Sequence, residues 1–284
     1  MGFLSLKELS QMDEKEIFTY ANSTNIENWY QTLEEYTIPT RFITLDMGSV
    51  NAIVQAIEAK KSGKPIPSTV SGIIQELTGK IDVEVNSFGS AFVRLSMRSP
   101  KDSPVAIKKG KERYGDAIES ATDEWEKNLL LVKSQKFGLK VSNGPEAMEL
   151  LLTSTRILDD LKDCQKFGFL PGIIVREWMD IDENAEFRGF VDDRKLVGLS
   201  QYFYYCYFPG IIERKAIILE QITSFFNEIK NILPVSSCIL DFALIDGKVI
   251  ILELNPFFVG TDACLFSWKT DTFETFEFRL NEGK

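Results

Sequence analysis

The segment IILELNPFFVGTD (residues 250–262) places polar residues at the end of an apolar run. In a β-strand, residues two apart point to the same face, so Glu253 and Asn255 are expected side by side, with Leu254 turned into the packing. Such a pair of oxygen ligands suits a hard cation such as magnesium, which takes few protein oxygens and shares the rest of its shell with water or phosphate. A strand end whose polar face lies in water is the alternative.

The composition excludes several kinds of active site. The 284 residues, 44% of them hydrophobic, can bury one large core or two closely joined ones. A net charge of −10 argues against sequence-independent binding to nucleic acid or anionic membranes. The chain has no histidine, which excludes Ser-His and Cys-His nucleophiles and histidine-bound zinc. Because it has neither an N-terminal apolar signal region nor an apolar run of 18 residues, a cytoplasmic location is expected.

Hydrophobic periodicity predicts helices and strands in alternation, followed by a β-rich C-terminal part. Helices are expected over 5–35, 49–62, 69–79, 105–135, 146–161 and 212–229. Strands are expected over 37–46, 83–97, 172–181, 185–191, 195–205 and 238–255. This order predicts an α+β fold with an N-terminal lobe (1–170) that carries a charged helical insertion (about 105–135), and a C-terminal lobe (171–284).

The predicted hairpin at 238–255 contains a further candidate ligand, the carboxylate of Asp241. Its turn, Asp246-Gly247, is the strongest hairpin signal in the chain. A two-residue turn pairs residue 245 with 248 and turns Asp241 away from Glu253, whereas one extra residue places the two carboxylates opposite each other. We therefore predict a three-residue loop, or a bulge beside Gly247, because both carboxylates must face one side to share a metal.

Two further groups of charges lie in apolar strands. Arg176, Glu186 and Arg188 are costly to bury unless each is paired within the protein or bound to a ligand. Arg94, Arg98 and Lys101 could meet phosphates. Neither a G-x-x-x-x-G-K-[ST] loop nor a G-x-G-x-x-G turn after a strand is present, so P-loop and Rossmann nucleotide binding are not indicated.

Seven segments in one order resemble a known family. They are NWYQTLEEYTIPTRFITL, FVRLSMRSPKD, IIVREWMDI, AEFRGFV, KLVGLSQ, ILDFAL and ILELNPFFVGTDACLFSW, which span about residues 27–268. The chain resembles the cell division cycle protein 123 family, ATP-grasp assembly chaperones for the gamma subunit of eukaryotic translation initiation factor 2. The resemblance implies an ATP-grasp-like fold whose two lobes, with antiparallel sheets, enclose Mg-ATP.

The resemblance also implies roles for individual residues. Backbone at Arg176, Glu177 and Trp178 would lie near the adenine, and Glu186 and Arg188 would face the ribose and phosphates. Arg94 stands where the family has a phosphate-binding lysine. Magnesium would be held by Asp241, Glu253 and Asn255, with Glu253 replacing an aspartate. The expected cofactors are ATP and Mg²⁺, and the expected partner is the gamma subunit or a related protein, bound by a monomer.

Some features depart from the family pattern and leave the activity open. The loop between the metal strands is one residue shorter, and a Lys-Ser-Ser motif appears as Leu152-Thr153-Ser154. An ATP-grasp ligase or phosphotransferase acting on an unidentified acceptor is the alternative to an assembly factor, and whether ATP is hydrolysed is left open. A protein-binding fold without nucleotide is disfavoured by the retained Asp241, Glu253 and Asn255.

Overall fold

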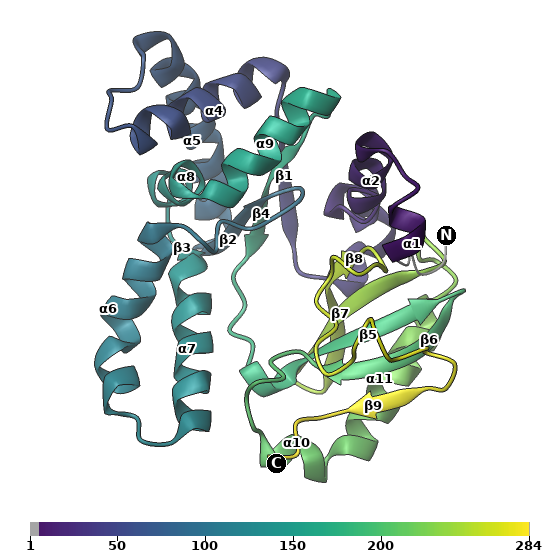
Figure 1. Cartoon of the computed structure of the whole chain (residues 1–284). Helices are drawn as coiled ribbons and strands as arrows, with labels where there is room; N and C mark the ends of the chain where they lie inside the picture. The colour runs from purple at the N-terminus through teal and green to yellow at the C-terminus, as the bar shows by residue number, and fades with distance from the viewer. Residues whose placement is uncertain (1–5, 284) are drawn as a thin grey trace. The chain divides into compact units, whose positions relative to one another are not determined.

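The computed structural model describes residues 6–283 and contains two sheets with helices packed on them (Figure 1). The α-helices are α1 (Leu6–Leu9), α2 (Glu14–Ala21), α3 (Tyr30–Leu33), α4 (Met47–Lys61), α5 (Ser68–Phe88), α6 (Pro104–Ser120), α7 (Glu124–Leu139), α8 (Gly144–Thr153), α9 (Thr155–Phe167), α10 (Pro209–Glu213) and α11 (Lys215–Ile229). The strands are β1 (Thr40–Thr44), β2 (Ala91–Leu95), β3 (Lys140–Val141), β4 (Gly172–Glu177), β5 (Glu186–Asp192), β6 (Lys195–Gln201), β7 (Cys238–Ile245), β8 (Lys248–Asn255) and β9 (Glu277–Arg279). Short 3₁₀ turns are η1 (Ile26–Asn28), η2 (Glu34–Tyr36) and η3 (Glu183–Ala185). The α+β class expected from the sequence is confirmed.

The chain forms two units, each built on one sheet. The four-stranded unit comprises Pro39–Thr122 and Leu130–Met179, and its sheet has the order β1-β4-β2-β3. The five-stranded unit comprises the described residues up to Ile38, Asp123–Leu129 and those from Asp180 onward, and its sheet has the order β8-β7-β5-β6-β9. This division differs from the one expected between residues 170 and 171, because β4 hydrogen-bonds to β1 and β2.

Helix α5 corrects one sequence prediction. A strand was expected from residue 83, yet the helix continues to Phe88 and ends at Gly89, whose φ is +76°. The reason is the spacing of the buried residues Val70, Ile74, Leu77, Ile81 and Val85, which keeps one helical face on the core past the point where Val83 and Val85 imitate strand alternation.

The predicted insertion is a pair of helices, α6 and α7. The helices approach so closely that a Cβ atom on Gly110 would lie 2.2 Å from the carbonyl oxygen of Ser134, and one on Gly138 would lie 2.2 Å from that of Ala106. Only glycine allows this approach. The pair is anchored by Lys109, which contacts both the carbonyl of Lys140 and the carboxylate of Glu146 on α8.

The β7–β8 hairpin corrects a second prediction. Its turn is the two-residue kind, because Ile245 pairs with Lys248, and both Asp246 (φ +49°) and Gly247 (φ +77°) have the positive φ of a type I′ turn. The extra residue lies farther along the strand, where Leu252 forms a bulge between the pairs Phe242–Ile251 and Asp241–Glu253. The expected loop was therefore wrong, although the pairing that it was meant to explain is present.

The five-stranded sheet is covered differently on its two faces. Helix α11 covers one face (Figure 1). Phe242 points to this face, since its ring lies 6.2 Å from that of Phe225 on α11. The opposite face carries an aromatic cluster in which Phe190 contacts Phe257 and Phe266 of the segment after β8. These aromatic contacts hold the segment after β8 against the face of the sheet that is opposite to α11.

No helix within residues 6–283 is long and apolar enough to cross a membrane. The expectation about an N-terminal signal region falls partly on residues 1–5, which lie outside the described residues.

Candidate functional site

A row of polar side chains crosses neighbouring strands on the face of the five-stranded sheet opposite α11. Arg188 on β5 lies opposite Asp241 on β7, which in turn lies opposite Glu253 on β8. Residues that are directly opposite on antiparallel strands project to the same face, and Asn255 follows Glu253 by two positions. The structure therefore brings together the three residues predicted to hold a metal and one residue predicted to face phosphates. Glu186, two residues before Arg188 on β5, belongs to the same face.

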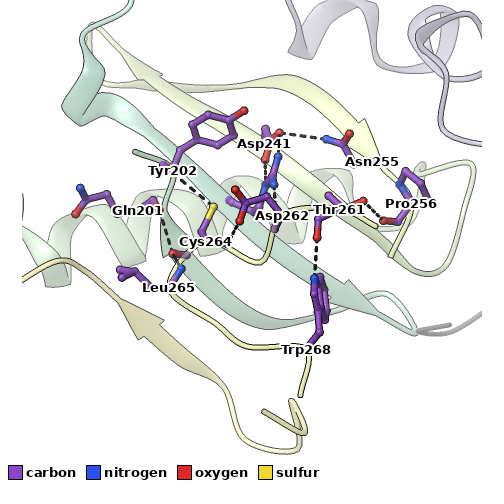
Figure 2. A network of polar contacts seen from close by, with 12 residues as sticks. Gln201, Tyr202, Asp241, Asn255, Pro256, Thr261, Asp262, Cys264, Leu265 and Trp268 are labelled. Atoms are coloured by element: carbon purple, nitrogen blue, oxygen red, sulfur yellow. Dashed lines mark hydrogen bonds and ion pairs between the residues drawn. The ribbon is translucent and has the colours of Figure 1, made fainter. Parts of the chain in front are cut away.

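The centre of this row is a buried ion pair. Arg188 donates from Nε to Oδ1 of Asp241 and from Nη2 to Oδ2, both at 2.8 Å. Arg188 is 5% exposed and Asp241 is 2% exposed. Asn255 donates from Nδ2 to Oδ2 of Asp241 at 3.2 Å, as Figure 2 shows. Removing one partner of such a pair typically costs about 3–5 kcal/mol, because the other charge is left buried and uncompensated.

Burial and pairing act in opposite directions on the two charges. Burial disfavours the charged guanidinium of Arg188, but the Asp241 carboxylate outweighs it, so the pKa of Arg188 is raised well above its ordinary value. Burial raises the pKa of Asp241, which Arg188 opposes and the nearby Glu253 and Asp262 reinforce. Arg188 is therefore the charge that favours the ionised form of Asp241, against the effect of burial.

Further contacts hold Arg188, among them one with the Cys264 thiol, and the sequence did not point to them. The Nη1 atom donates to the backbone carbonyl of Asp262 at 2.6 Å. The guanidinium carbon lies 4.9 Å from the centre of the Tyr202 ring, a cation–π contact. Burial raises the pKa of Tyr202, as do the carboxylates of Asp241, Glu253 and Glu186. Asp262 appears in the sequence analysis only within longer segments, one of which carries the family resemblance, and Tyr202 lies in the aromatic run 202–205, which gave no distinct signal.

The segment that supplies the Asp262 carbonyl is tied down by its own hydrogen bonds. Trp268 donates from its indole to the carbonyl of Thr261 at 2.7 Å, and the Thr261 hydroxyl donates to the carbonyl of Pro256 at 3.0 Å (Figure 2). Leu265 donates its backbone N–H to the hydroxyl of Ser200 on β6 at 3.2 Å. The carbonyl that Arg188 meets is thus held in place by both ends of its own segment and by the sheet.

The donor set fits a small hard cation. Asp241, Glu253 and Asn255 offer carboxylate and amide oxygens, which are the ligands of magnesium, and the amide nitrogen of Asn255 is already bonded to Asp241. Within residues 6–283, no group of three or more Asp, Glu or Cys side chains has the arrangement of a metal site. A cation here would therefore rest on two carboxylates and an amide, with other oxygens from solvent or an anion.

The remaining predicted residues belong to the four-stranded unit. Arg94, on β2, is 9% exposed, and its guanidinium donates to the carbonyls of Leu95 at 3.0 Å and Met97 at 2.7 Å. Arg98 donates from Nε to Asp160 at 2.7 Å. Both arginines, which the sequence analysis considered as possible phosphate contacts, thus bond to the loop after β2 and, for Arg98, to helix α9.

The end of β4, which the resemblance places near the adenine, already makes hydrogen bonds within its own sheet. Arg176 is 5% exposed and donates from Nε to the hydroxyl of Thr40. The backbone N–H groups of Glu177 and Trp178 donate to the carbonyls of Pro39 at 2.9 Å and Ser90 at 3.0 Å. An adenine at this strand end would therefore meet groups other than these two N–H donors.

Comparisons with known proteins agree on one family. The D123 family profile matches residues 130–278, which is more than half of the chain. The chain is 35% identical over 205 residues to the "Translation initiation factor eIF2 assembly protein" of Xenopus laevis, covering 68% of this chain and 53% of that protein. It is 26% identical over 267 residues to the "Putative CDC123-like protein L884" of Acanthamoeba polyphaga mimivirus, covering 87% of this chain and 69% of that protein.

A solved structure shows the same fold. The structure of Cdc123 from Schizosaccharomyces pombe matches with a TM-score of 0.65 and 19% sequence identity, over 93% of this chain and 97% of that one. In length, the chain spans about half of the eIF2 assembly proteins from Candida albicans (52%) and Xenopus laevis (53%).

Proposed function

The chain belongs to the D123 family, the family of Cdc123, and we propose that it binds ATP together with Mg²⁺ and acts as an assembly factor for eukaryotic translation initiation factor 2. The observation that carries the nucleotide part is the row Arg188, Asp241, Glu253 and Asn255 on one sheet face. It combines an arginine with oxygen ligands for a hard cation, which is the pairing that a metal-bound polyphosphate needs.

The residues of this row have distinct proposed roles. Glu253 and the amide oxygen of Asn255 hold the cation beside Asp241, and bound Mg²⁺ would neutralise and orient the phosphates. Arg188 uses three of its five N–H donors on Asp241 and the Asp262 carbonyl and also bonds the Cys264 thiol, so one donor remains for phosphate oxygens. For the four-stranded unit, Arg94 and the backbone at Arg176–Trp178 remain proposed nucleotide contacts on the strength of the family resemblance.

A thermal melt tests the nucleotide proposal. A ligand that binds only the folded state adds RT ln(1 + [L]/Kd), or roughly 2.7 kcal/mol at about 100 times its Kd. We expect the melting temperature to rise with ATP and MgCl₂ together. An unchanged melt with both would contradict the proposal. Product analysis after incubation decides between the two functional classes, because intact ATP supports an assembly factor, whereas ADP or AMP would identify a phosphotransferase or ligase.

The partner proposal rests on the names of the relatives and is tested separately. The matched proteins from Xenopus laevis and Candida albicans are named eIF2 assembly proteins. We propose the gamma subunit as the partner, bound in the cytoplasm by a monomer. A pull-down from a eukaryotic lysate, with and without Mg-ATP, should recover this subunit. Recovery of the initiation factor without enrichment of the gamma subunit would contradict the assignment.

A further inference from the structure

The Asp241 carboxylate has little capacity left for a cation. Each carboxylate oxygen can accept about two hydrogen bonds or metal bonds. Oδ2 accepts from both Arg188 and Asn255, and is therefore filled. Oδ1 accepts from Nε of Arg188 at 2.8 Å and keeps one position. A cation bound at Asp241 must use that position beside the guanidinium, or displace the guanidinium.

Charge makes both routes unfavourable for a cation by itself. A divalent ion at Oδ1 would lie within a few ångströms of the guanidinium, which as an arginine side chain always carries its charge, in a site with little water, where like charges repel strongly. Displacement of Arg188 would leave its charge buried without a partner. Arg188 is held on two other sides as well, by the Asp262 carbonyl and the Tyr202 ring.

A polyphosphate removes this obstacle. Its oxygens can bond the remaining N–H donor of Arg188 while they coordinate the cation, so that the two positive groups share one anion. An anion without the cation would instead face Asp241 and Glu253, whose charges repel it. The position at Asp241 is thus unfavourable to either ion by itself and favourable to the two together.

We propose that Arg188 makes cation binding at Asp241 conditional on a polyphosphate, so that the ligand of this sheet face is a metal–oligophosphate complex and neither ion separately. The inference rests on the proposed function for its ligand, but it concerns how the site is controlled. Arg188 blocks cation binding at Asp241 until a polyphosphate is bound, and we call this role a gate. The coupling between the binding of the cation and the binding of the polyphosphate therefore depends on Arg188.

The test uses Mn²⁺ as the probe, with binding followed by water-proton relaxation. In Arg188→Gln, Asp241 has no cationic partner, so Mn²⁺ can take that role without any phosphate. We expect Arg188→Gln to bind Mn²⁺ by itself roughly 10-fold or more tightly than the wild type does. Arg188→Lys keeps the charge and should remain as weak as the wild type. Arg214→Gln, which removes an exposed arginine of the same unit, is the matched control. An Arg188→Gln protein whose affinity for Mn²⁺ equals that of the wild type would overturn the proposal.

A measurement on the wild type covers the case in which Arg188→Gln does not fold. Thermal melts are recorded with MnCl₂ alone, with inorganic triphosphate alone, with both, and with MnCl₂ and ATP. The proposal expects stabilisation only when cation and polyphosphate are present together, and stabilisation by MnCl₂ alone would overturn it. These melts distinguish the proposed function from the proposed role of Arg188. If no sample that contains a polyphosphate raises the melting temperature, the proposed function is disproved. If Mn-ATP stabilises the wild type while Arg188→Gln gains no Mn²⁺ affinity, only the gate is disproved.

Discussion

Asp241 on β7 lies directly opposite Glu253 on β8, although the turn that joins the two strands contains only Asp246 and Gly247. A regular two-residue hairpin would have placed Leu252 there and turned Glu253 to the other face. The bulge at Leu252 supplies the missing residue, so that both carboxylates project to the face that carries Arg188.

Glu253→Gln is expected to weaken metal-dependent nucleotide binding without unfolding the protein. The side chain is partly exposed at a strand end, so that its fold contribution is small, whereas loss of a ligand charge should reduce Mg-ATP affinity by roughly 10-fold or more. Calorimetric titration measures the affinity, and urea denaturation measures the stability. Glu220→Gln, on the exposed side of α11, is the control and should change neither. A Glu253→Gln protein that unfolds would instead assign Glu253 a structural pairing.

Removal of Leu252 tests whether the bulge serves only to set the pairing. Without this residue, a two-residue turn at Asp246-Gly247 brings Glu253 opposite Asp241 in a regular ladder. We therefore expect the deletion variant to keep Mg-ATP affinity within roughly a few-fold, since the ligands stay on one face. Deletion of Ile245 from the other strand should abolish binding, because it shifts Asp241 out of this pairing. Loss of binding in the Leu252 deletion would show that the local twist of the bulge matters as well.

Gly247→Ala is expected to reduce the free energy of unfolding by about 1 kcal/mol. Gly247 has φ +77°, and a Cβ atom there would meet nothing within 4 Å, so the cost comes from backbone strain and not from a clash. Gly210→Ala is the matched control, because its added Cβ also meets nothing and the residue lies in helix α10. Urea denaturation should therefore show a loss for Gly247→Ala and none for Gly210→Ala.

The sequence predicted which polar residues share the sheet face of Arg188 better than it predicted the backbone that brings them there. Glu253 and Asn255 could be assigned to one face, because strand periodicity is local. The bulge at Leu252 could not be placed, because a bulge depends on the partner strand, and a turn-side insertion satisfied the same requirement. Arg98 could be considered for a phosphate contact because its partner Asp160, 62 positions away in the sequence, could not be recognised. The helical continuation past residue 83 was missed because Val83 and Val85 alternate with charged residues as strand residues do.

Asp102 is expected to stabilise the four-stranded unit in a pH-dependent way. Its carboxylate accepts hydrogen bonds from the Ser154 hydroxyl and from the backbone N–H groups of Thr155 (3.0 Å) and Arg156 (3.1 Å), at the start of α9. Burial opposes the charged form, but these hydrogen bonds outweigh it and lower the pKa of Asp102 below its ordinary value of 3.8. The folded state thus binds the Asp102 proton more weakly than the unfolded state does. The contribution is therefore complete above the unfolded pKa and is lost as the pH falls through the folded one.

Comparison of the wild type with Asp102→Asn across pH isolates this contribution. The amide has no charge and cannot accept at both oxygen positions, so we expect Asp102→Asn to be less stable at pH 7 by a margin that stays constant down to about pH 5. Below the ordinary pKa of 3.8, the margin should shrink, because the wild-type carboxyl becomes protonated as well. Asp116→Asn, which changes an exposed carboxylate of α6, is the control for general charge effects. Urea denaturation at each pH gives the free energies of unfolding. A margin that is the same at pH 3 as at pH 7 would mean that Asp102 acts through the shape of its side chain, and that its charge contributes nothing to the start of α9.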